Sequence, residues 1–202
     1  YAANCEEADI NWMQPPVVGD LDDPARPGDE PEIMARLQDT LYAFAIFDNR
    51  GRRLLTHREE NDQRIHPQMR ENPLISLANI DGVGMAEIVI GTRVYFLHRS
   101  PEGTLSVAHY FEGQPTYVGH SNILGATPCI ADLLGDERLE IFAGGTAFGM
   151  PPKPEGIESP ADCADMAAMD PESQAYCSGQ LLVHWQVPHV PDDSYFDGFC
   201  AV

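Results

Sequence analysis

The residues with the clearest potential for chemistry lie in segment 79–91, where oxygen-bearing side chains recur around two glycines. These side chains occupy its first, third and ninth positions: Asn79, Asp81 and Glu87. Gly82 and Gly84 permit the positive-φ turns that fold backbone carbonyls inward. Carboxylates that alternate around a glycine turn are the arrangement by which a short loop surrounds a hard cation with oxygen atoms. The segment therefore predicts a Ca²⁺ loop that runs into a buried strand at 88–90.

Two other segments have the same internal order, in which an apolar stretch ends in Asp, an acidic loop follows, and a Glu-Ile pair opens the next apolar stretch. The Glu residues of the three pairs are 55 and 53 residues apart. The candidate calcium ligands of the three loops are Asp20, Asp22, Glu32, Asn79, Asp81, Glu87, Asp132, Asp136 and Glu140. A unit of this length that recurs with one internal order indicates a repeat architecture, and a repeat of short strands favours β-propeller blades.

The elements that must position these loops are short strands. Apolar segments predict strands at 15–19, 33–37, 40–48, 52–57, 74–78, 88–91, 93–98, 105–111, 122–131, 141–144 and 180–187. The fold class is therefore all-β, and the chain is one propeller segment over residues 1–202. Its blade units are expected at about 15–72, 73–121 and 122–192. Residues 149–180 are rich in Pro, Gly, Asp and Ala, which predicts an inserted surface loop with a helical turn near 161–169.

The end of the chain predicts an incomplete ring. Residues 195–202 resemble the first strand of another unit. A closed propeller needs at least about four blades, so three units and a stub do not close one. We expect the ring to be completed by a remainder of the same chain or by another protein chain, and the chain itself to be processed or a piece of something longer.

The charge and the cysteines restrict the partners and the compartment. A net charge of −20 argues against nucleic acid, because phosphate binding needs clustered Lys and Arg. No apolar run approaches the roughly 20 residues of a membrane span. Five cysteines occur without a CxxC pair. Cys163 and Cys177 bracket a polar segment and could staple it, which fits an oxidising, extracellular compartment or the cell surface.

The three loops resemble FG-GAP/VCBS-type repeats, which occur in integrin α-subunit propellers and in many secreted bacterial proteins. The shared pattern is an apolar strand followed by D-x-D-G-D-G-x-x-E-I-V-x-G, and each loop matches it in part. The first loop has Asp20-Leu21-Asp22 with Glu32-Ile33, and the second has Asn79-Ile80-Asp81-Gly82 with Gly84 and Glu87–Gly91. The third has Asp132-Leu133, Gly135-Asp136 and Glu140-Ile141. The resemblance covers most of residues 15–148. It departs from the pattern at the insertion 24–27, at Val83 and at Leu134, each of which removes or displaces an expected ligand.

The resemblance implies a multi-bladed extracellular propeller with Ca²⁺ in its loops, but not one activity. The first hypothesis is a non-enzymatic module with a structural, assembly or adhesion role. The alternative is part of a polysaccharide-active, lyase-like enzyme that uses Ca²⁺ at its site, with a glycan as ligand. No catalytic residue is singled out, because the seven histidines show no HExxH spacing and no G-x-S-x-G occurs. For the loops, a metal-free alternative stays open, in which Asp and Gly form the turn and Glu accepts hydrogen bonds from backbone amides.

Overall fold

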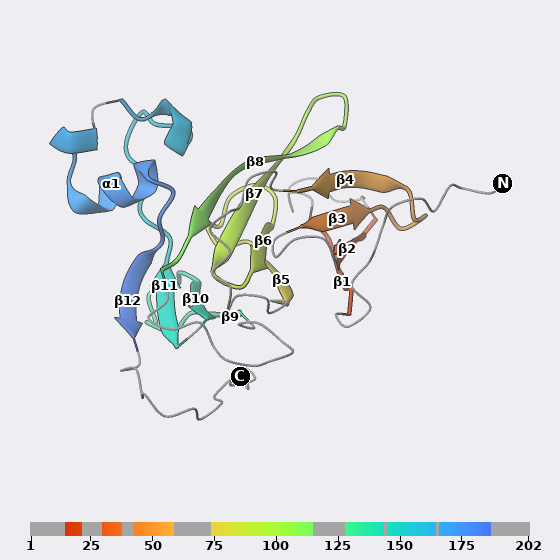
Figure 1. Cartoon of the computed structure of the whole chain (residues 1–202), viewed down its shortest axis with the longest axis horizontal. Coiled ribbons are helices and arrows are strands. Elements are labelled where there is room, and N and C mark those ends of the chain that lie inside the picture. The colour runs from red at the N-terminus through yellow and green to blue at the C-terminus, as the bar shows by residue number, and fades with distance from the viewer. Residues whose placement is uncertain are drawn as a thin grey trace.

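The strands of the protein form three separate sheets, each made of four strands that follow one another in the chain (Figure 1). The computed structural model describes residues 15–21, 30–37, 43–58, 74–114, 128–143, 145–164 and 166–186. All neighbouring strands in the sheets pair antiparallel. The all-β prediction is confirmed. The candidate ligand Asp22 and the predicted stub 195–202 lie outside the described residues.

The strands have the following bounds. The first sheet contains β1 (Val17–Gly19), β2 (Glu32–Arg36), β3 (Phe44–Phe47) and β4 (Arg53–His57). The second contains β5 (Ile75–Ala78), β6 (Glu87–Ile90), β7 (Arg93–Arg99) and β8 (Leu105–Glu112). The third contains β9 (Cys129–Ala131), β10 (Glu140–Ala143), β11 (Thr146–Gly149) and β12 (Leu182–Gln186). Every predicted strand is present. β11 is not predicted from the sequence, because Ala and Gly weaken the strand signal of its residues TAFG.

The second sheet is buried on both faces because it lies between the other two, as Figure 1 shows. Successive residues of a strand point to opposite faces. Accordingly Ile88 and Ile90 of β6 belong to a core shared with the first sheet, whereas Val89 belongs to a core shared with the third sheet. The first core includes Met34, Phe44, Ile46, Ile88, Ile90 and Tyr95. The second core includes Val89, Val94, Phe111, Ile141, Phe148 and Tyr176. This placement explains why β6 is apolar at three consecutive positions rather than alternating.

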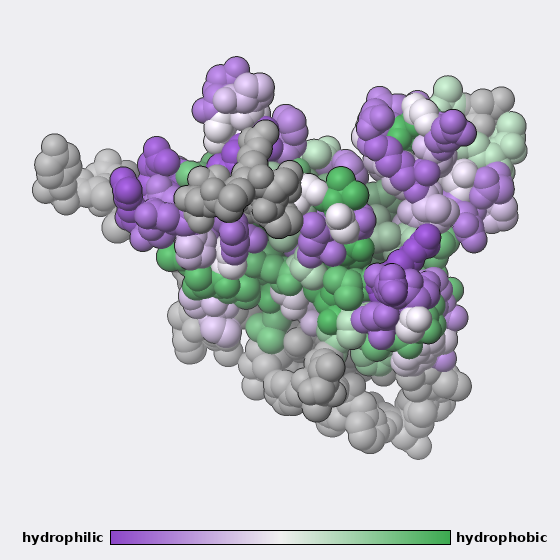
Figure 2. Space-filling view, turned by 180° about the vertical axis from the view of Figure 1, so that it is seen from behind, coloured by the Kyte–Doolittle hydropathy of each residue, from purple (hydrophilic) through white to green (hydrophobic). Residues whose placement is uncertain are grey.

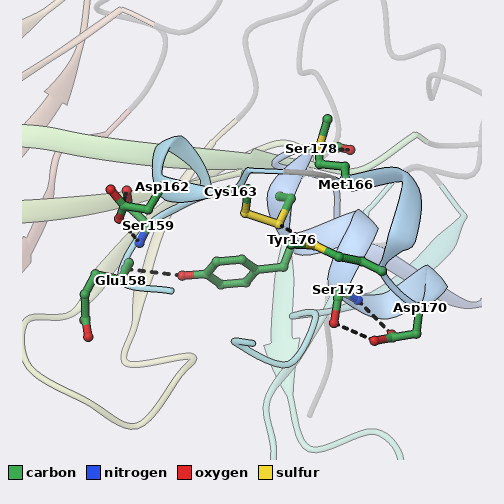
Figure 3. The surroundings of a disulfide bond; sticks show 11 residues. Glu158, Ser159, Asp162, Cys163, Met166, Asp170, Ser173, Tyr176 and Ser178 are labelled. Carbon is green, nitrogen blue, oxygen red and sulfur yellow. Dashed lines mark hydrogen bonds between the residues drawn. A yellow bond between two sulfur atoms is a disulfide. The ribbon is translucent and has the colours of Figure 1, made fainter. Parts of the chain in front are cut away.

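The connection between β11 and β12 is the predicted insertion, and a disulfide holds it. It contains two 3-10 turns, η1 (Pro160–Asp162) and η2 (Met166–Ala168), and the helix α1 (Pro171–Cys177). Cys163 and Cys177 form a disulfide with Cα atoms 5.6 Å apart (Figure 3). Asp170 caps α1, since its carboxylate accepts hydrogen bonds from the backbone N–H of Glu172 and Ser173, both at 3.0 Å. The disulfide considered from the sequence, between Cys163 and Cys177, is therefore present.

The insertion returns across the edge of the second sheet. Leu181 N–H donates to the carbonyl of Glu112 at 3.1 Å, and Glu112 N–H donates to the carbonyl of Gly179 at 2.8 Å. The ring of Tyr176 lies 5.3 Å from that of Phe111. Seen from behind, hydrophobic surface lies in the middle of the molecule, beneath hydrophilic protrusions (Figure 2). Among the helices of the described ranges, none has the length and apolar character to cross a membrane.

Candidate functional site

The three acidic loops are closed by the same hydrogen bond. The first residue of β2, β6 and β10 is a glutamate whose side chain is almost fully buried. In each case Oε2 accepts a hydrogen bond from a backbone N–H at the start of the loop, one residue after the Asp or Asn. The donors are Leu21 at 3.1 Å from Glu32, Ile80 at 2.6 Å from Glu87, and Leu133 at 2.7 Å from Glu140. The buried carboxylate therefore ties the end of each loop to its beginning, as the metal-free alternative expects.

The second loop contains an oxygen atom that lacks a partner. Among the described residues, Asn79 Oδ1 is buried without a hydrogen bond, while its Nδ2 donates to the carbonyl of Gly84 at 3.4 Å. Asp81 Oδ1 accepts from the N–H of Val83 at 2.9 Å. Gly82 and Gly84 both have a positive φ, at 73° and 72°. A buried polar oxygen without a hydrogen bond costs free energy, and a cation bound in this loop would remove that cost.

The raised pKa of Glu87 is a second observation that favours a bound cation in this loop. Burial raises the pKa of Glu87 to about 8, an effect that the hydrogen bond from Ile80 N–H opposes and that the neighbouring carboxylate of Asp81 increases. A buried carboxylate with this pKa holds its proton at neutral pH unless a positive charge lies beside it. Asn79, Asp81 and Glu87 therefore fit a divalent cation, which would supply the missing charge and coordinate the free oxygen.

The third loop is different, because its carboxylates bond to the loop's own backbone. Asp132 Oδ1 accepts from Gly135 N–H at 2.6 Å and from Asp136 N–H at 3.1 Å, and its Oδ2 accepts from Glu137 N–H at 3.0 Å. Asp136 Oδ1 accepts from Arg138 N–H at 3.1 Å. Glu137 has a φ of 69°, in the left-handed region that non-glycine residues seldom adopt. Asp132, Asp136 and Glu140 therefore fit the turn-forming role better than a metal-binding role.

In the first loop, the described candidates are Asp20, which is exposed at the end of β1, and the buried Glu32. Glu32 Oε1 accepts a hydrogen bond from Arg99 Nη2 at 3.1 Å, so an arginine already provides a positive charge at this carboxylate. The three loops belong to three different sheets. Asp81 of the second loop and Asp136 of the third line the same cavity, which the described candidates of the first loop do not line. Within the described ranges, no three His, Cys, Asp or Glu side chains are grouped as a preformed metal site.

The structure also contains a cavity of about 460 Å³ between the second sheet, the third sheet and the insertion. Its charged lining comes mainly from the β5–β6 loop, the β9–β10 loop and the insertion, which includes α1. The charged residues there include Asp81, Asp136, Arg138, Lys153, Glu158 and Glu172. This cavity is not predictable from local sequence, because its walls come from segments far apart in the chain and form no contiguous motif.

Aromatic side chains line part of this cavity. The imidazole of His109 stacks on the ring of Phe96, with centroids 4.7 Å apart and planes 13° from parallel. Burial lowers the pKa of His109; the charge of Asp81 opposes this effect and that of Lys153 adds to it. Burial also raises the pKa of Tyr176, whose hydroxyl donates to the carbonyl of Glu158 at 3.4 Å.

His184 lies on the cavity wall because residue 149 has no side chain. A Cβ atom at Gly149 would collide with the imidazole Nε2 of His184. The glycine therefore allows the ring to lie directly over the backbone of β11, where both residues line the cavity. The cavity thus combines an aromatic interior with acidic and basic groups, an arrangement suited to holding a small polar ligand.

Comparisons of the chain with protein-family models, with curated proteins and with solved structures gave no match.

Proposed function

We propose that the three sheets are neighbouring blades of a β-propeller of the FG-GAP/VCBS type, and that the chain is a secreted or cell-surface module with a structural, assembly or adhesion role. The observation that carries this proposal is the recurrence of one hydrogen bond, from the loop backbone to the buried glutamate, at the same position of three consecutive four-stranded sheets. Face-to-face packing of the sheets, with the second buried on both sides, supports it.

A disulfide supports the extracellular part of the proposal, since such bonds persist in oxidising compartments. The acidic composition is compatible with a surface that binds cations.

The second loop is the one in which we place Ca²⁺, with Asn79, Asp81 and Glu87 as its side-chain ligands. Their oxygens are hard ligands of the kind that Ca²⁺ prefers, and backbone carbonyls and water would complete the set of about six to eight. When bound, the ion would fix the loop and take the place of the proton on Glu87. Its role is rigidity: it holds the turn that leads from β5 into β6 in the middle one of the three sheets.

The outer face of the third sheet gives a reason to expect further blades. Ile141 and Phe148 face the second sheet, so the neighbouring Phe142 points to the opposite side. On that side the ring of Phe142 lies 5.2 Å from the ring of Trp185, which is 43% exposed. Another blade, from the same chain or a partner, would cover these side chains and bring the ring nearer to closure.

Thermal unfolding of the whole chain with Ca²⁺ and with a chelator tests the calcium role. We expect Ca²⁺ to raise the Tm of the wild type, and we expect Asn79→Ala to abolish that increase. Asp136→Asn is the matched control, because Asp136 is engaged with its own loop backbone; it should retain the increase. A Tm that does not respond to Ca²⁺ or to the chelator would leave the loops as metal-free turns and would remove the calcium part of the proposal.

The second candidate function, part of a polysaccharide-active enzyme, is favoured by one observation. The cavity brings His109 and Arg138 together with several carboxylates, and such groups can act as acid, base and charge stabiliser. Incubation of the protein with acidic and with neutral polysaccharides, followed by detection of new chain ends, tests it. Cleavage of a polysaccharide by the wild type but not by His109→Gln would support the enzymatic function. Intact polysaccharides would contradict it and favour the structural role.

A further inference from the structure

The cavity between the second and third sheets has a charge that suggests a ligand class. Its lining contains more carboxylates than basic side chains: Asp81, Asp136, Glu140, Glu158 and Glu172 against Arg138 and Lys153. A cleft with low-dielectric walls and one dominant sign of charge concentrates ligands of the opposite sign. The whole chain adds to this field with its net charge of −20. The occupant that this electrostatic field selects is therefore a cation.

The partners of the individual groups support this charge count. Lys153 Nζ donates to Glu158 Oε2 at 2.7 Å, so these two charges largely cancel. Glu140 is almost fully buried and accepts two backbone hydrogen bonds, whereas Asp81 and Asp136 are exposed and each accept one. Among the described residues, Asp81, Asp136 and Glu172 form no ion pair, which leaves three carboxylates around the cavity against the guanidinium of Arg138. Burial lowers the pKa of His109, which disfavours a positive charge on its ring.

The size and the walls of the cavity favour an organic cation over a metal ion. Calcium ligands stand about 2.3–2.6 Å from the ion, whereas these carboxylates belong to two loops and a helix around a space of about 460 Å³. A volume of this order accommodates a small molecule. Phe96, Phe111 and Tyr176 provide aromatic walls, which pack against an apolar group and also attract ammonium ions. Figure 3 shows Tyr176 extending from α1 toward Glu158, on the side formed by the insertion.

We propose that this cavity binds a small organic cation, with its ammonium group among Asp81, Asp136 and Glu172 and its apolar part against Phe96 and the neighbouring aromatic walls. The inference does not require calcium in the second loop, since Ca²⁺ bound there would occupy Asp81 and leave Asp136 and Glu172 for the ammonium group. It also requires no catalysis, since the groups only have to hold the ligand.

Saturation-transfer NMR and calorimetry on the whole chain, with three probes that share one ring, test the proposal. Benzylamine is the cation, benzyl alcohol the neutral analogue and benzoate the anion. We expect saturable binding of benzylamine, at least about fivefold tighter than binding of either analogue, and weaker binding as salt concentration rises. Equal binding of all three probes, tighter binding of benzoate, or no saturable binding of benzylamine would overturn the proposal. Preferential binding of a neutral trisaccharide such as cellotriose would assign the cavity to glycans instead.

Glu172→Gln is the decisive variant, because Glu172 is an exposed residue of α1 outside the calcium loop. It should weaken benzylamine binding about two- to fivefold, the range typical of one partly screened charge. Glu155→Gln is the matched control, since Glu155 is also exposed in the insertion but does not line the cavity; it should leave binding unchanged. Equal effects of the two variants would show only a general charge effect and would contradict the site. Each titration is run with Ca²⁺ and with a chelator, so a failure of the calcium proposal is seen separately as an unresponsive Tm.

Discussion

Glu32 and Arg99 join the first sheet to the second: Arg99 Nη2 donates to Glu32 Oε1 at 3.1 Å across a separation of 67 residues. The other oxygen of Glu32 accepts from Leu21 N–H at 3.1 Å. One buried carboxylate therefore closes its own loop and at the same time contacts the last residue of β7. The local turn and the packing of neighbouring sheets are thus coupled through a single side chain.

We expect Arg99→Met to lower the free energy of unfolding by about 1–3 kcal/mol. The substitution keeps most of the aliphatic packing but removes a charged partner from Glu32, whose side chain is 4% exposed. Denaturant unfolding measures the change. Arg52→Met is the matched control, because Arg52 pairs with Asp48 on the surface with its own side chain 78% exposed; no measurable loss is expected there. Equal losses in the two variants would show that Glu32–Arg99 is no more than a surface contact.

The pKa of Glu87 predicts how stability depends on pH when Ca²⁺ is absent. Its pKa is raised from 4.5 to about 8 by burial, so the folded state retains a proton that the unfolded chain releases above about pH 4.5. The contribution to stability is therefore fully present below pH 4.5 and is lost as pH rises through about 8. Glu87→Gln should remove this part of the pH dependence, because an amide does not titrate. The amide oxygen can still accept the hydrogen bond from Ile80 N–H, so the loop contact is retained.

Denaturant unfolding of both proteins between pH 4.5 and 8 in a chelator measures the effect, with Glu155→Gln as the exposed control. Addition of Ca²⁺ should stabilise the wild type at the upper end of the range and leave Glu87→Gln almost unchanged, since a neutral amide does not replace a charged ligand. Parallel pH curves for wild type and Glu87→Gln would contradict the assignment of a buried protonated carboxylate.

Local sequence signals predict the strands and the loop boundaries but not the differences among the loops. The run Ile88-Val89-Ile90 is a buried strand because each face of β6 packs on another sheet, and three consecutive apolar residues carry that information. The third loop is the more acidic of the two described in full, yet Asp132 turns its oxygens to its own backbone. That outcome depends on the left-handed φ of Glu137, a conformation that composition does not reveal.

Features that arise from packing between distant segments leave no trace in a local pattern. The Glu32–Arg99 pair and the cavity both require sheets to lie side by side, and the strand pattern alone does not say which faces meet. The disulfide is the exception, since Cys163 and Cys177 are close in the chain and enclose a segment without apolar periodicity. Because these two cysteines are close in sequence, their disulfide could be predicted from the sequence.

Gly113 provides a test of how closely the second and third sheets pack. A Cβ atom at this position would lie 2.7 to 2.9 Å from three atoms of the Phe148 ring, which is fully buried. Gly113→Ala should therefore lower the free energy of unfolding by about 1–3 kcal/mol through overpacking. A double-mutant cycle with Phe148→Leu supplies the control, because the smaller side chain makes room for the added methyl group. Additive effects of the two substitutions would show that these sheets do not meet as closely as described.

The disulfide of the insertion should affect both stability and the cavity, because Cys177 ends the helix that carries Glu172 and Tyr176. Replacement of Cys163 and Cys177 by Ala opens a bridge between residues 14 positions apart, and cross-links of this span contribute about 3 kcal/mol. We expect a lower free energy of unfolding, faster protease cleavage within 150–181 and weaker benzylamine binding, with the sheets retained in circular dichroism. A thiol reductant also opens the disulfide of Cys129, so the comparison concerns cleavage within 150–181: there the reduced wild type should be cut as fast as the double variant, and the double variant no faster than without reductant. If the insertion resists protease equally in all of these samples, contacts such as Tyr176 with Phe111 hold it without the bond, and the predicted coupling between the disulfide and the cavity is wrong.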